Sequence, residues 1–482
     1  MLFNSLQFLI FFPIVVIFYF TIPHKYRWVL LLLASYYFYM CWKAEYLILI
    51  LVSTLIDYIA GIKMGKTTVK AERKVYLILS LLINLGLLFT FKYFNFFSES
   101  FHQVFQYFNI MYKVPSLKVL LPVGISFYTF QTLSYTIDVY RGKREPETHL
   151  GIFALYVSFF PQLVAGPIER STRLLPQFYE KMEFDYQRVK DGLLLMAWGF
   201  FKKVVIADRL AILVNQVYNN PTDYSGFPLI LATYFFAFQI YCDFSGYSDI
   251  AIGAAQVMGY RLMLNFNRPY FSKSISEFWK RWHISLSSWF RDYLYIALGG
   301  NRVKKWRWYL NVYLVFIISG LWHGANWTFI VWGSLHGFYL LFSTWTQKYR
   351  TVLFDAVAPI RFEMIRKVLR VLITFHLVLF SWIFFRANSL HEAFYIISHL
   401  FSGLNMSALN TISGFGTPEL MFVIGAIAVM EFIHMVQRKH GIRKLLGQQP
   451  LMIRWAIYYF LIMTILLFGA YDYSNAFIYF QF

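Results

Sequence analysis

A histidine in the middle of a long apolar run is the residue of this sequence best suited to chemistry. His323 has apolar or small neighbours, with Gly320 and Gly324 close by and Asn326 three positions on. Its imidazole, with an ordinary pKa of about 6.5, can stay neutral in a membrane and still accept a proton. The glycines leave room for a slender substrate, and Asn326 could orient the ring or donate to an oxyanion. The pattern favours general-base catalysis, although the residues alone equally allow a histidine that only hydrogen-bonds a neighbouring helix.

Three other histidines have weaker claims to a functional role. His283 lies four residues after Trp279 and two after Arg281, so it borders an aromatic helical face. A histidine in that setting is commonly a solvated residue. His336 and His376 lie in apolar surroundings and are interpreted as packing residues.

Two carboxylates fall inside another apolar run, at Asp243 and Asp249. A carboxylate at the centre of a membrane helix costs about 2.5–3.5 kcal/mol, so both side chains should face protein or a water-filled cavity. They form either a hydrogen-bonded clasp between helices or part of the wall of a substrate cavity.

Several familiar chemistries have no matching motif in this chain. There is no Gly-x-Ser-x-Gly elbow, His-Glu-x-x-His zinc motif, phosphate-binding glycine loop or dinucleotide fingerprint. The two cysteines, Cys41 and Cys242, build neither a disulfide framework nor a metal-binding spacing. An ordinary serine hydrolase and a nucleotide-driven pump are disfavoured, and no metal site is expected.

The elements that position these residues must lie in a membrane. The 482 residues are 59% hydrophobic and only 14% charged, far more apolar than a soluble domain. The net charge of +20 comes largely from basic clusters in short connections, as at 63–74 and 302–307. These clusters indicate cytoplasmic loops, which could also meet anionic lipid headgroups or an anionic cofactor. Nucleic acid is not indicated as a partner.

Apolar runs long enough to cross a bilayer recur along the chain, and we expect one membrane domain over residues 1–482. The first run lacks a basic leader and a small-residue cleavage site, so we expect an uncleaved span with the N-terminus outside. The spans expected from apolar length are 3–22, 28–42, 44–61, 76–97, 119–138, 191–218, 226–259, two helices in 309–345, 367–386, a short one at 390–402, 419–437 and 452–470.

Three segments do not fit a simple span. Residues 150–168 contain Pro161 and Pro167 and predict a re-entrant or kinked segment. Residues 169–190 are polar and amphipathic. In 274–296 the apolar residues recur every three or four positions, which predicts one amphipathic helix in the cytoplasmic interface.

On these residues the chain resembles the membrane-bound O-acyltransferases, and within them the bacterial branch that O-acetylates alginate. The resemblance covers almost the whole chain, and its motifs are specific. Only Ala297, where relatives often have proline, departs from them. The matching segments are Pro122–Gln131, Phe160–Ile168, Asp243–Asp249, Phe278–Leu286, Arg291–Ile296, Leu298–Arg302, Gly320–Gly324 and Trp382–Ala387.

The resemblance implies an all-α polytopic fold of about eleven transmembrane helices, with re-entrant and interfacial helices around a thinned centre and two opposite cavities. His323 matches the near-invariant catalytic histidine of the family, and His283 matches the second histidine of this branch. Candidates for binding substrate or an oxyanion are Asn326, Trp322, Gly324, Trp279 and Asp243.

The resemblance also implies a reaction and partners in a bacterial inner membrane. An acetyl group would leave a cytoplasmic thioester, acetyl-CoA or an acyl carrier, with no permanently bound cofactor. It would reach an extracytoplasmic polysaccharide such as alginate, cellulose or peptidoglycan through a periplasmic acetyltransferase. The alternatives are D-alanyl transfer to teichoic acid from a carrier protein, and a non-catalytic acyl transporter that uses Asp243, Asp249 and His323 as a polar pathway.

Overall fold

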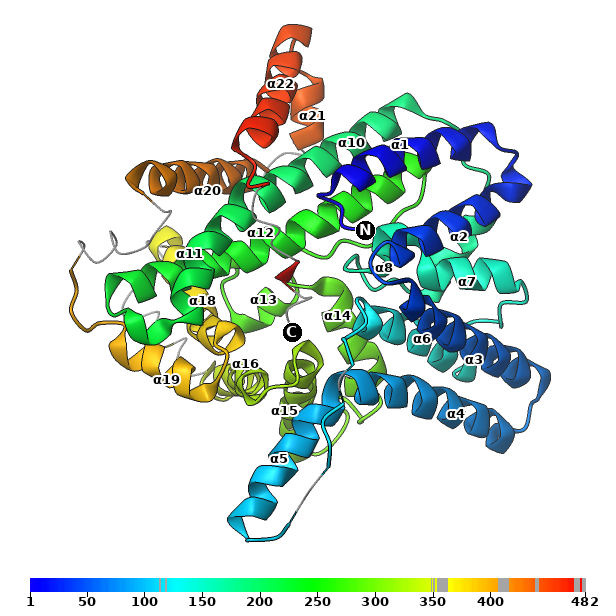
Figure 1. Cartoon of the computed structure of the whole chain (residues 1–482), viewed down its shortest axis with the longest axis horizontal. Helices are drawn as coiled ribbons and strands as arrows, with labels where there is room; N and C mark the ends of the chain where they lie inside the picture. Colours follow the sequence, from blue (N-terminus) through cyan, green and yellow to red (C-terminus); the bar gives the residue numbers. More distant parts are fainter. Residues whose placement is uncertain are drawn as a thin grey trace. The chain divides into compact units, whose positions relative to one another are not determined.

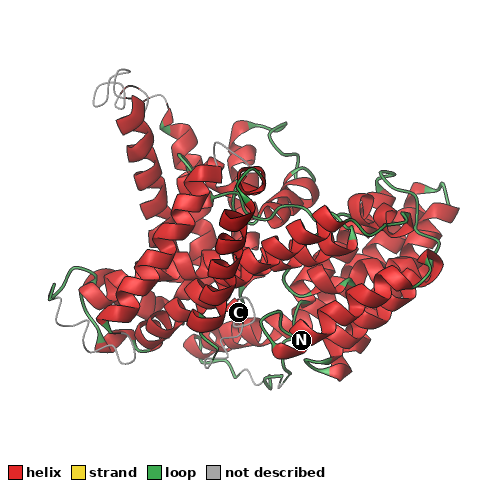
Figure 2. Ribbon diagram, turned by 90° about the horizontal axis from the view of Figure 1, so that it is seen from above, coloured by secondary structure: helices red, strands yellow, loops and turns green. Residues whose placement is uncertain are grey.

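Every regular element in the described part of the chain is a helix, joined by loops (Figure 2). The computed structural model describes residues 1–482 except 112–113, 118, 348, 350–351, 353–362, 406–415, 438–441, 472–476 and 479–482. The all-α fold class expected from the apolar runs is confirmed.

The chain forms two compact units. The first comprises Met1–Met196 with Ile250–Met263, and the second Ala197–Asp249 with Leu264–Phe482. Two long helices, α10 (Tyr186–Phe200) and α12 (Phe227–Met258), contribute residues to both units. The single membrane domain expected over the whole chain stays a prediction.

The first unit is built on neighbouring antiparallel helices near the N-terminus. Within it α3 packs against both α4 and α6, and α2 packs against α1 and α7. The segment with two prolines is broken between α7 and α8, as the sequence predicted, and its side chains are almost all buried. Its elements are α1 Leu6–Thr21, α2 His24–Met40, η1 Ala44–Tyr46, α3 Leu47–Lys66, α4 Lys70–Leu88, η2 Phe89–Tyr93, α5 Phe94–Tyr107, α6 Ile125–Tyr140, α7 Leu150–Ser158, α8 Phe160–Leu163, α9 Ser171–Leu174 and η3 Leu175–Tyr179.

The second unit holds all the candidate site residues. In its core α16 packs against both α15 and α18. Its other elements are η4 Phe201–Ala207, α11 Asp208–Asn219, η5 Pro221–Asp223, η6 Pro269–Phe271, α13 Ile275–Trp279, α14 Ile284–Trp289, η7 Phe290–Tyr295, α15 Lys305–His323, α16 Trp327–Trp345, α18 Glu363–Arg386, α19 Leu390–His399, α20 Thr417–Gln437, α21 Ile442–Gly447 and α22 Leu451–Phe468.

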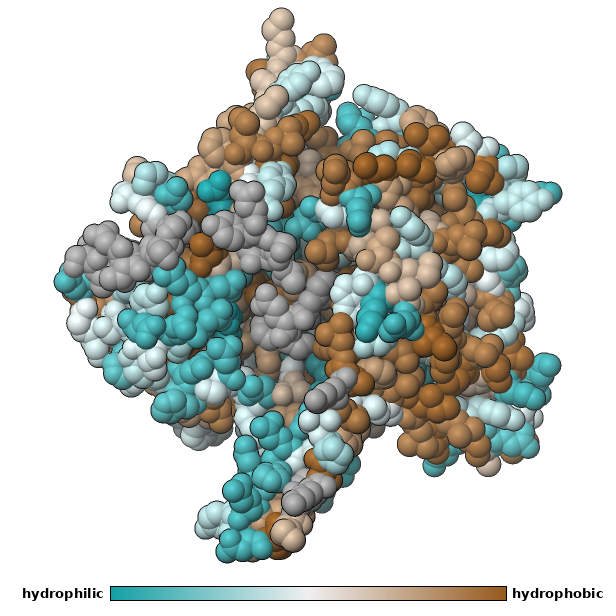
Figure 3. Space-filling model, in the orientation of Figure 1, coloured by the Kyte–Doolittle hydropathy of each residue, from teal (hydrophilic) through white to brown (hydrophobic). Residues whose placement is uncertain are grey.

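Six helices of the described residues are long and apolar enough to cross a membrane, and α1 is a shorter apolar helix. Their outward faces are hydrophobic, as over α3 and α4, where the surface is mostly brown (Figure 3). The protein is therefore a multi-pass membrane protein, and the expected count of about eleven spans stays a prediction. The six are Ala44–Lys66, Lys70–Tyr107, Phe227–Met258, Glu363–Arg386, Thr417–Gln437 and Leu451–Phe468.

The prediction of one continuous amphipathic helix over 274–296 is wrong. Helix α13 ends at Trp279, and α14 begins only at Ile284. Between them His283 adopts a left-handed backbone with φ 42° and ψ 54°, which no α-helix accommodates. Backbone hydrogen bonds to the preceding segment replace the helical ones, from Ile284 N to Asn265 O (2.9 Å) and from Asn267 N to Arg281 O (2.9 Å). Periodicity could not reveal this break because its cause is a tertiary pairing.

The expected pair of helices within 309–345 is confirmed as α15 and α16, which lie side by side (Figure 1). They approach closely at two glycines. A Cβ on Gly320 would lie 2.2 Å from Phe329 O, and one on Gly333 would lie 2.3 Å from Phe316 O. Because neither glycine has a side chain, α15 and α16 can approach this closely at Gly320, three residues before His323.

Gly333→Ala should force these helices apart, because the new methyl group would overlap a backbone oxygen that cannot move alone. Overpacking of this kind costs about 1–3 kcal/mol. We expect a lower midpoint of thermal unfolding in detergent and reduced activity. Gly425→Ala in α20 is the matched control, since nothing lies within 4 Å of its added Cβ. Equal midpoints for the two variants would contradict the proposed close approach.

Candidate functional site

His323 is the last residue of α15, and aromatic rings enclose it. Only 3% of its surface is exposed. Its ring centroid lies 4.9 Å from that of Trp322, 5.0 Å from Trp332 and 5.4 Å from Phe385. These rings come from α15, α16 and α18, so three helices form the environment of one imidazole.

The structure brings the two predicted histidines together. The ring centroids of His283 and His323 are 6.4 Å apart, although the residues lie 40 positions apart in the sequence. Trp322 contacts both rings, with a centroid distance of 6.1 Å to His283. Two imidazoles at this separation can serve one reacting group from two sides.

His283 is fully buried at the break between α13 and α14. Phe244 meets its ring edge-on at 4.6 Å, and Asn265 Oδ1 lies 3.2 Å from its Nδ1. Burial lowers the pKa of His283 to about 3, so the ring is neutral at physiological pH. The alternative of a solvated interfacial histidine is therefore wrong, because Phe244 of α12, Asn265 and Trp322 of α15 contact this ring.

Trp279 forms a hydrogen bond with a third buried histidine, His336, rather than with His283 or His323. Its indole N–H donates to His336 Nδ1 (3.3 Å), and His336 Nε2 donates to Ser381 Oγ (2.9 Å), which itself donates to Val378 O. His336 thus has a packing role, as expected, in a chain of hydrogen bonds that links α13, α16 and α18. The indole of Trp279 also contacts Trp332, whose ring contacts His323.

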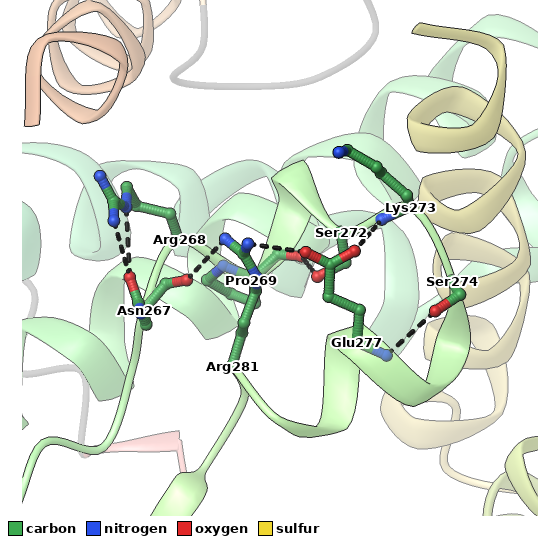
Figure 4. Close-up of polar contacts among 8 residues, drawn as sticks. All are labelled: Asn267, Arg268, Pro269, Ser272, Lys273, Ser274, Glu277 and Arg281. Atoms are coloured by element: carbon green, nitrogen blue, oxygen red, sulfur yellow. Dashed lines mark hydrogen bonds and ion pairs between the residues drawn. The ribbon is translucent and has the colours of Figure 1, made fainter. Parts of the chain in front are cut away.

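The short helix α13 is anchored by polar contacts at both ends (Figure 4). Ser274 Oγ accepts from Glu277 N at its start, and Glu277 Oε1 pairs with Arg281 (2.6 Å) just beyond its end. Arg281 also donates to Asn267 O (3.4 Å), and Arg268 donates to Asn267 Oδ1. These contacts tie the segment that leads into His283 to the loop that precedes η6.

Asn326 caps the helix that follows His323. Its Oδ1 accepts from Thr328 N (3.0 Å), and its Nδ2 donates to Asn388 O (2.9 Å). Gly324 lies between the two helices in an extended conformation, where a Cβ would meet the ring of Phe329 at 2.1 Å. Both residues therefore shape the turn after His323, and a direct role of Asn326 towards an oxyanion stays a prediction.

Asp243 lies in a buried ion-pair cluster that the sequence analysis did not anticipate. Lys203 Nζ lies 2.7 Å from Asp243 Oδ1 and 2.9 Å from Asp208 Oδ1, and Ile478 N donates to Asp243 Oδ2 (2.9 Å). Asp249 pairs with the adjacent lysine, Lys202, at 2.7 Å. These bonds correspond to the clasp interpretation of the two aspartates. Two consecutive lysines within the apolar run 191–218 were the sequence signal that could have predicted these ion pairs.

Asn265 and Trp332 carry no sequence signal, and only the folded chain places them against the histidines. Phe385 lies in the matching segment Trp382–Ala387, but its contact with His323 could not be predicted from the sequence. Among the described residues no three His, Cys, Asp or Glu side chains gather as metal ligands do.

Removing Lys203 should destabilise the protein far more than removing Asp243. Lys203→Met leaves two buried carboxylates facing each other, and breaking a buried pair costs about 3–5 kcal/mol. Asp243→Asn keeps the Lys203–Asp208 pair and an oxygen that accepts from Ile478 N. The midpoint of thermal unfolding measures both, with the exposed Lys181→Met as control. A folded Asp243→Asn protein without activity would instead give Asp243 a role in the reaction.

Comparisons with known proteins identify a family. A model of the membrane-bound O-acyltransferase family matches residues 148–386, which contain both histidines. A probable alginate O-acetylase of Azotobacter vinelandii is 40% identical over 93% of this chain and 86% of its own length. A peptidoglycan O-acetyltransferase of Helicobacter pylori is 38% identical over 78% and 73%, and a teichoic acid D-alanyltransferase of Bacillus subtilis is 30% identical over 56% and 70%.

The extent and level of these similarities establish what kind of protein this is. Relatives named as O-acetylases match most of the chain at about 40% identity, and the chain itself has several helices long and apolar enough to cross a membrane. The chain belongs to the membrane-bound O-acyltransferase family and is a multi-pass O-acetyltransferase.

Proposed function

We propose that this enzyme takes an acetyl group from cytoplasmic acetyl-CoA and delivers it across the bacterial inner membrane for O-acetylation of an extracytoplasmic polysaccharide. The N-terminus lies on the periplasmic side in this proposal, and the basic loops face the cytoplasm. The observation that carries the proposal is the pair of buried histidines, His323 and His283, held 6.4 Å apart by residues of separate helices.

His323 acts as the general base in the proposed reaction. Its neutral imidazole removes the proton from an acceptor hydroxyl while the hydroxyl oxygen attacks the thioester carbonyl. The tetrahedral intermediate then collapses, the C–S bond breaks, and the proton passes from the imidazolium to the departing thiolate. The products are an acetyl ester and CoA, with no net proton released. General-base assistance of this kind contributes typically about 10²–10⁴-fold in rate.

His283 positions the thioester or takes part in the proton transfers beside His323. Because it stays neutral, it can accept a hydrogen bond without adding a buried charge to the site. The oxyanion is stabilised by the side chain of Asn326 or by backbone N–H groups near Gly324, where helix α15 has ended. Trp322, which touches both imidazoles, forms one wall of the reacting space.

Access to His323 requires movement of its neighbours. With 3% of its surface exposed, the ring meets a donor and an acceptor only when side chains such as Phe385 or Trp322 turn aside. The donor enters from the cytoplasm with its phosphates at the basic loops, and the acceptor enters from the opposite side. Exclusion of water from the closed state protects the thioester from hydrolysis.

The polysaccharide is alginate or a related glycan, and a periplasmic acetyltransferase receives the acetyl group first. The names of the relatives support this class of acceptor, since they specify alginate in one case and peptidoglycan in another. Both acceptors are glycans outside the cytoplasmic membrane.

D-Alanyl transfer from a carrier protein is the second candidate. Its support is the 30% identity to the teichoic acid D-alanyltransferase of Bacillus subtilis. That similarity covers 56% of the chain, whereas the O-acetylases cover up to 93%, so acetyl transfer is favoured. The third alternative, a non-catalytic acyl transporter, is not favoured, because the chain is an O-acetyltransferase and a transporter would not need a reactive His323.

His323→Ala should abolish polysaccharide O-acetylation, because no other group replaces the base at this position. Ester-linked acetate on the exported polysaccharide is measured in cells that carry the variant, with the membrane abundance of the protein measured in parallel. His376→Ala is the matched control, an exposed histidine of α18 that contacts Tyr234. Normal acetylation in cells with His323→Ala would remove this residue from the mechanism.

The donor is tested with purified protein and acetyl-CoA. Wild-type protein should bind acetyl-CoA and release free CoA thiol in the presence of its acceptor, while His323→Ala should retain binding and lose release. Calorimetry measures binding, and a thiol reagent measures release. No binding at millimolar acetyl-CoA, together with transfer from a loaded carrier protein, would favour the second candidate.

A further inference from the structure

A buried asparagine side chain lies directly against the second histidine of the site. Asn265 is 0% exposed and follows α12 in the loop that leads to η6. Its Oδ1 lies 2.7 Å from Ser285 Oγ, 3.3 Å from Ser285 N and 3.2 Å from His283 Nδ1. On the other side its Nδ2 donates to Ser248 Oγ at 3.3 Å. One amide group therefore joins α12, the loop and the start of α14.

The orientation of this amide is fixed by a partner that can only donate. A backbone N–H has no lone pair, so the atom of Asn265 that faces Ser285 N must be the oxygen. Reversing the amide would place an NH₂ group against the N–H of Ser285. It would also remove the acceptor that Ser285 Oγ contacts.

The orientation of the amide determines where the histidine carries its proton. Since Asn265 Oδ1 can only accept, the contact with His283 Nδ1 is a hydrogen bond only when the proton lies on Nδ1. We propose that Asn265 is a positioning residue that fixes His283 in the Nδ1–H tautomer and leaves the lone pair on Nε2. Nε2 is then the atom of His283 that accepts a hydrogen bond or a proton during acyl transfer.

The same segment holds the backbone of His283 in its unusual conformation. A left-handed conformation is unfavourable for a residue with a Cβ, so neighbouring bonds must secure it. Asn265 O accepts from Ile284 N, and Asn267 N donates to Arg281 O, both at 2.9 Å. Asn267 is further tied to Arg281 through its carbonyl (Figure 4). Backbone and ring of His283 are thus oriented together by residues 265–267.

An amide suits this task better than a carboxylate would. A carboxylate beside an imidazole orients it and also stabilises the imidazolium, whereas an uncharged oxygen orients it without favouring the charged form. The rings that contact His283 include the uncharged Phe244 and Trp322 and the titratable His323. This environment is consistent with the low pKa that burial gives His283.

The tautomer can be observed directly, without any assay of activity. Wild-type protein is labelled with ¹⁵N-histidine, and the His283 signals are assigned by their loss in His283→Gln. At pH 7.5 we expect a neutral ring with the proton on Nδ1. Ser248→Ala removes only the bond on the far side of the amide and should keep this spectrum, whereas Asn265→Leu should give the other tautomer or a mixture. A wild-type ring with its proton on Nε2, or a charged ring, would overturn the proposal whatever the variants do.

The consequence for acyl transfer rests on the proposed function and is measured separately. Asn265→Leu should lower kcat for acetyl-CoA turnover by about 10–100-fold at every pH, by analogy with the loss of a residue that orients a metal-bound histidine, with KM nearly unchanged. Asn265→Asp keeps an acceptor but adds a charge that raises the pKa of His283. Its activity should therefore fall below wild type at pH 6 and recover towards pH 8.5, where the imidazole is neutral again.

A purely structural Asn265 would behave differently. Both variants would then lose activity in proportion to their loss of thermal stability, with the pH profile of the wild type, and that result would overturn the positioning role. If wild-type protein does not turn over acetyl-CoA, the donor proposal fails while the ¹⁵N spectra still decide the tautomer. If Asn265→Leu does not fold, the wild-type spectrum and the pH profile of Asn265→Asp decide it.

Discussion

Polar groups buried in apolar surroundings without a partner cost far more free energy than the same groups at a surface, and this constraint organises the second unit of the protein. Lys203 meets this cost by lying between two aspartates, and Lys202 by pairing with Asp249. Trp279 donates to His336, which donates onward to Ser381. Each of these bonds joins two helices. A bond that gives a buried polar atom its partner therefore also fixes how the two helices are arranged.

The chemistry of the site follows from the same constraint. An imidazole is the side chain that can be buried neutral and still exchange a proton near physiological pH. His323 and His283 are both buried imidazoles in contact with aromatic rings. Burial lowers the pKa of His283, so its ring stays neutral. In the proposed reaction the site gains charge only when the acceptor proton moves to His323. Asn265 follows the same rule, because its amide oxygen determines which ring nitrogen of His283 carries the proton without adding a charge to the site.

Close helix packing supplies the remaining condition. His323 stands at the end of α15, where the chain turns into α16 through Gly324 and the cap made by Asn326. Gly320 and Gly333 let the two helices approach until backbone meets backbone. The position of the imidazole therefore depends on the missing side chains of the glycines as well as on the hydrogen bonds of Asn326. The sequence predicted that Asn326 would orient the imidazole or stabilise an oxyanion. In the structure its hydrogen bonds to Thr328 and Asn388 form the turn between α15 and α16.

The sequence by itself determined the helical membrane class and the pair of helices in 309–345, because apolar length is a local property of the chain. It also singled out His323 as the candidate base, because a titratable residue within an apolar run can be recognised locally. It did not reveal the break at His283, the lysine partners of the two aspartates or the amide at Asn265. Those features depend on contacts between residues far apart in the sequence. Only the tertiary structure decided them, because hydrogen bonds and ion pairs form between whichever polar atoms the packing of helices brings within reach.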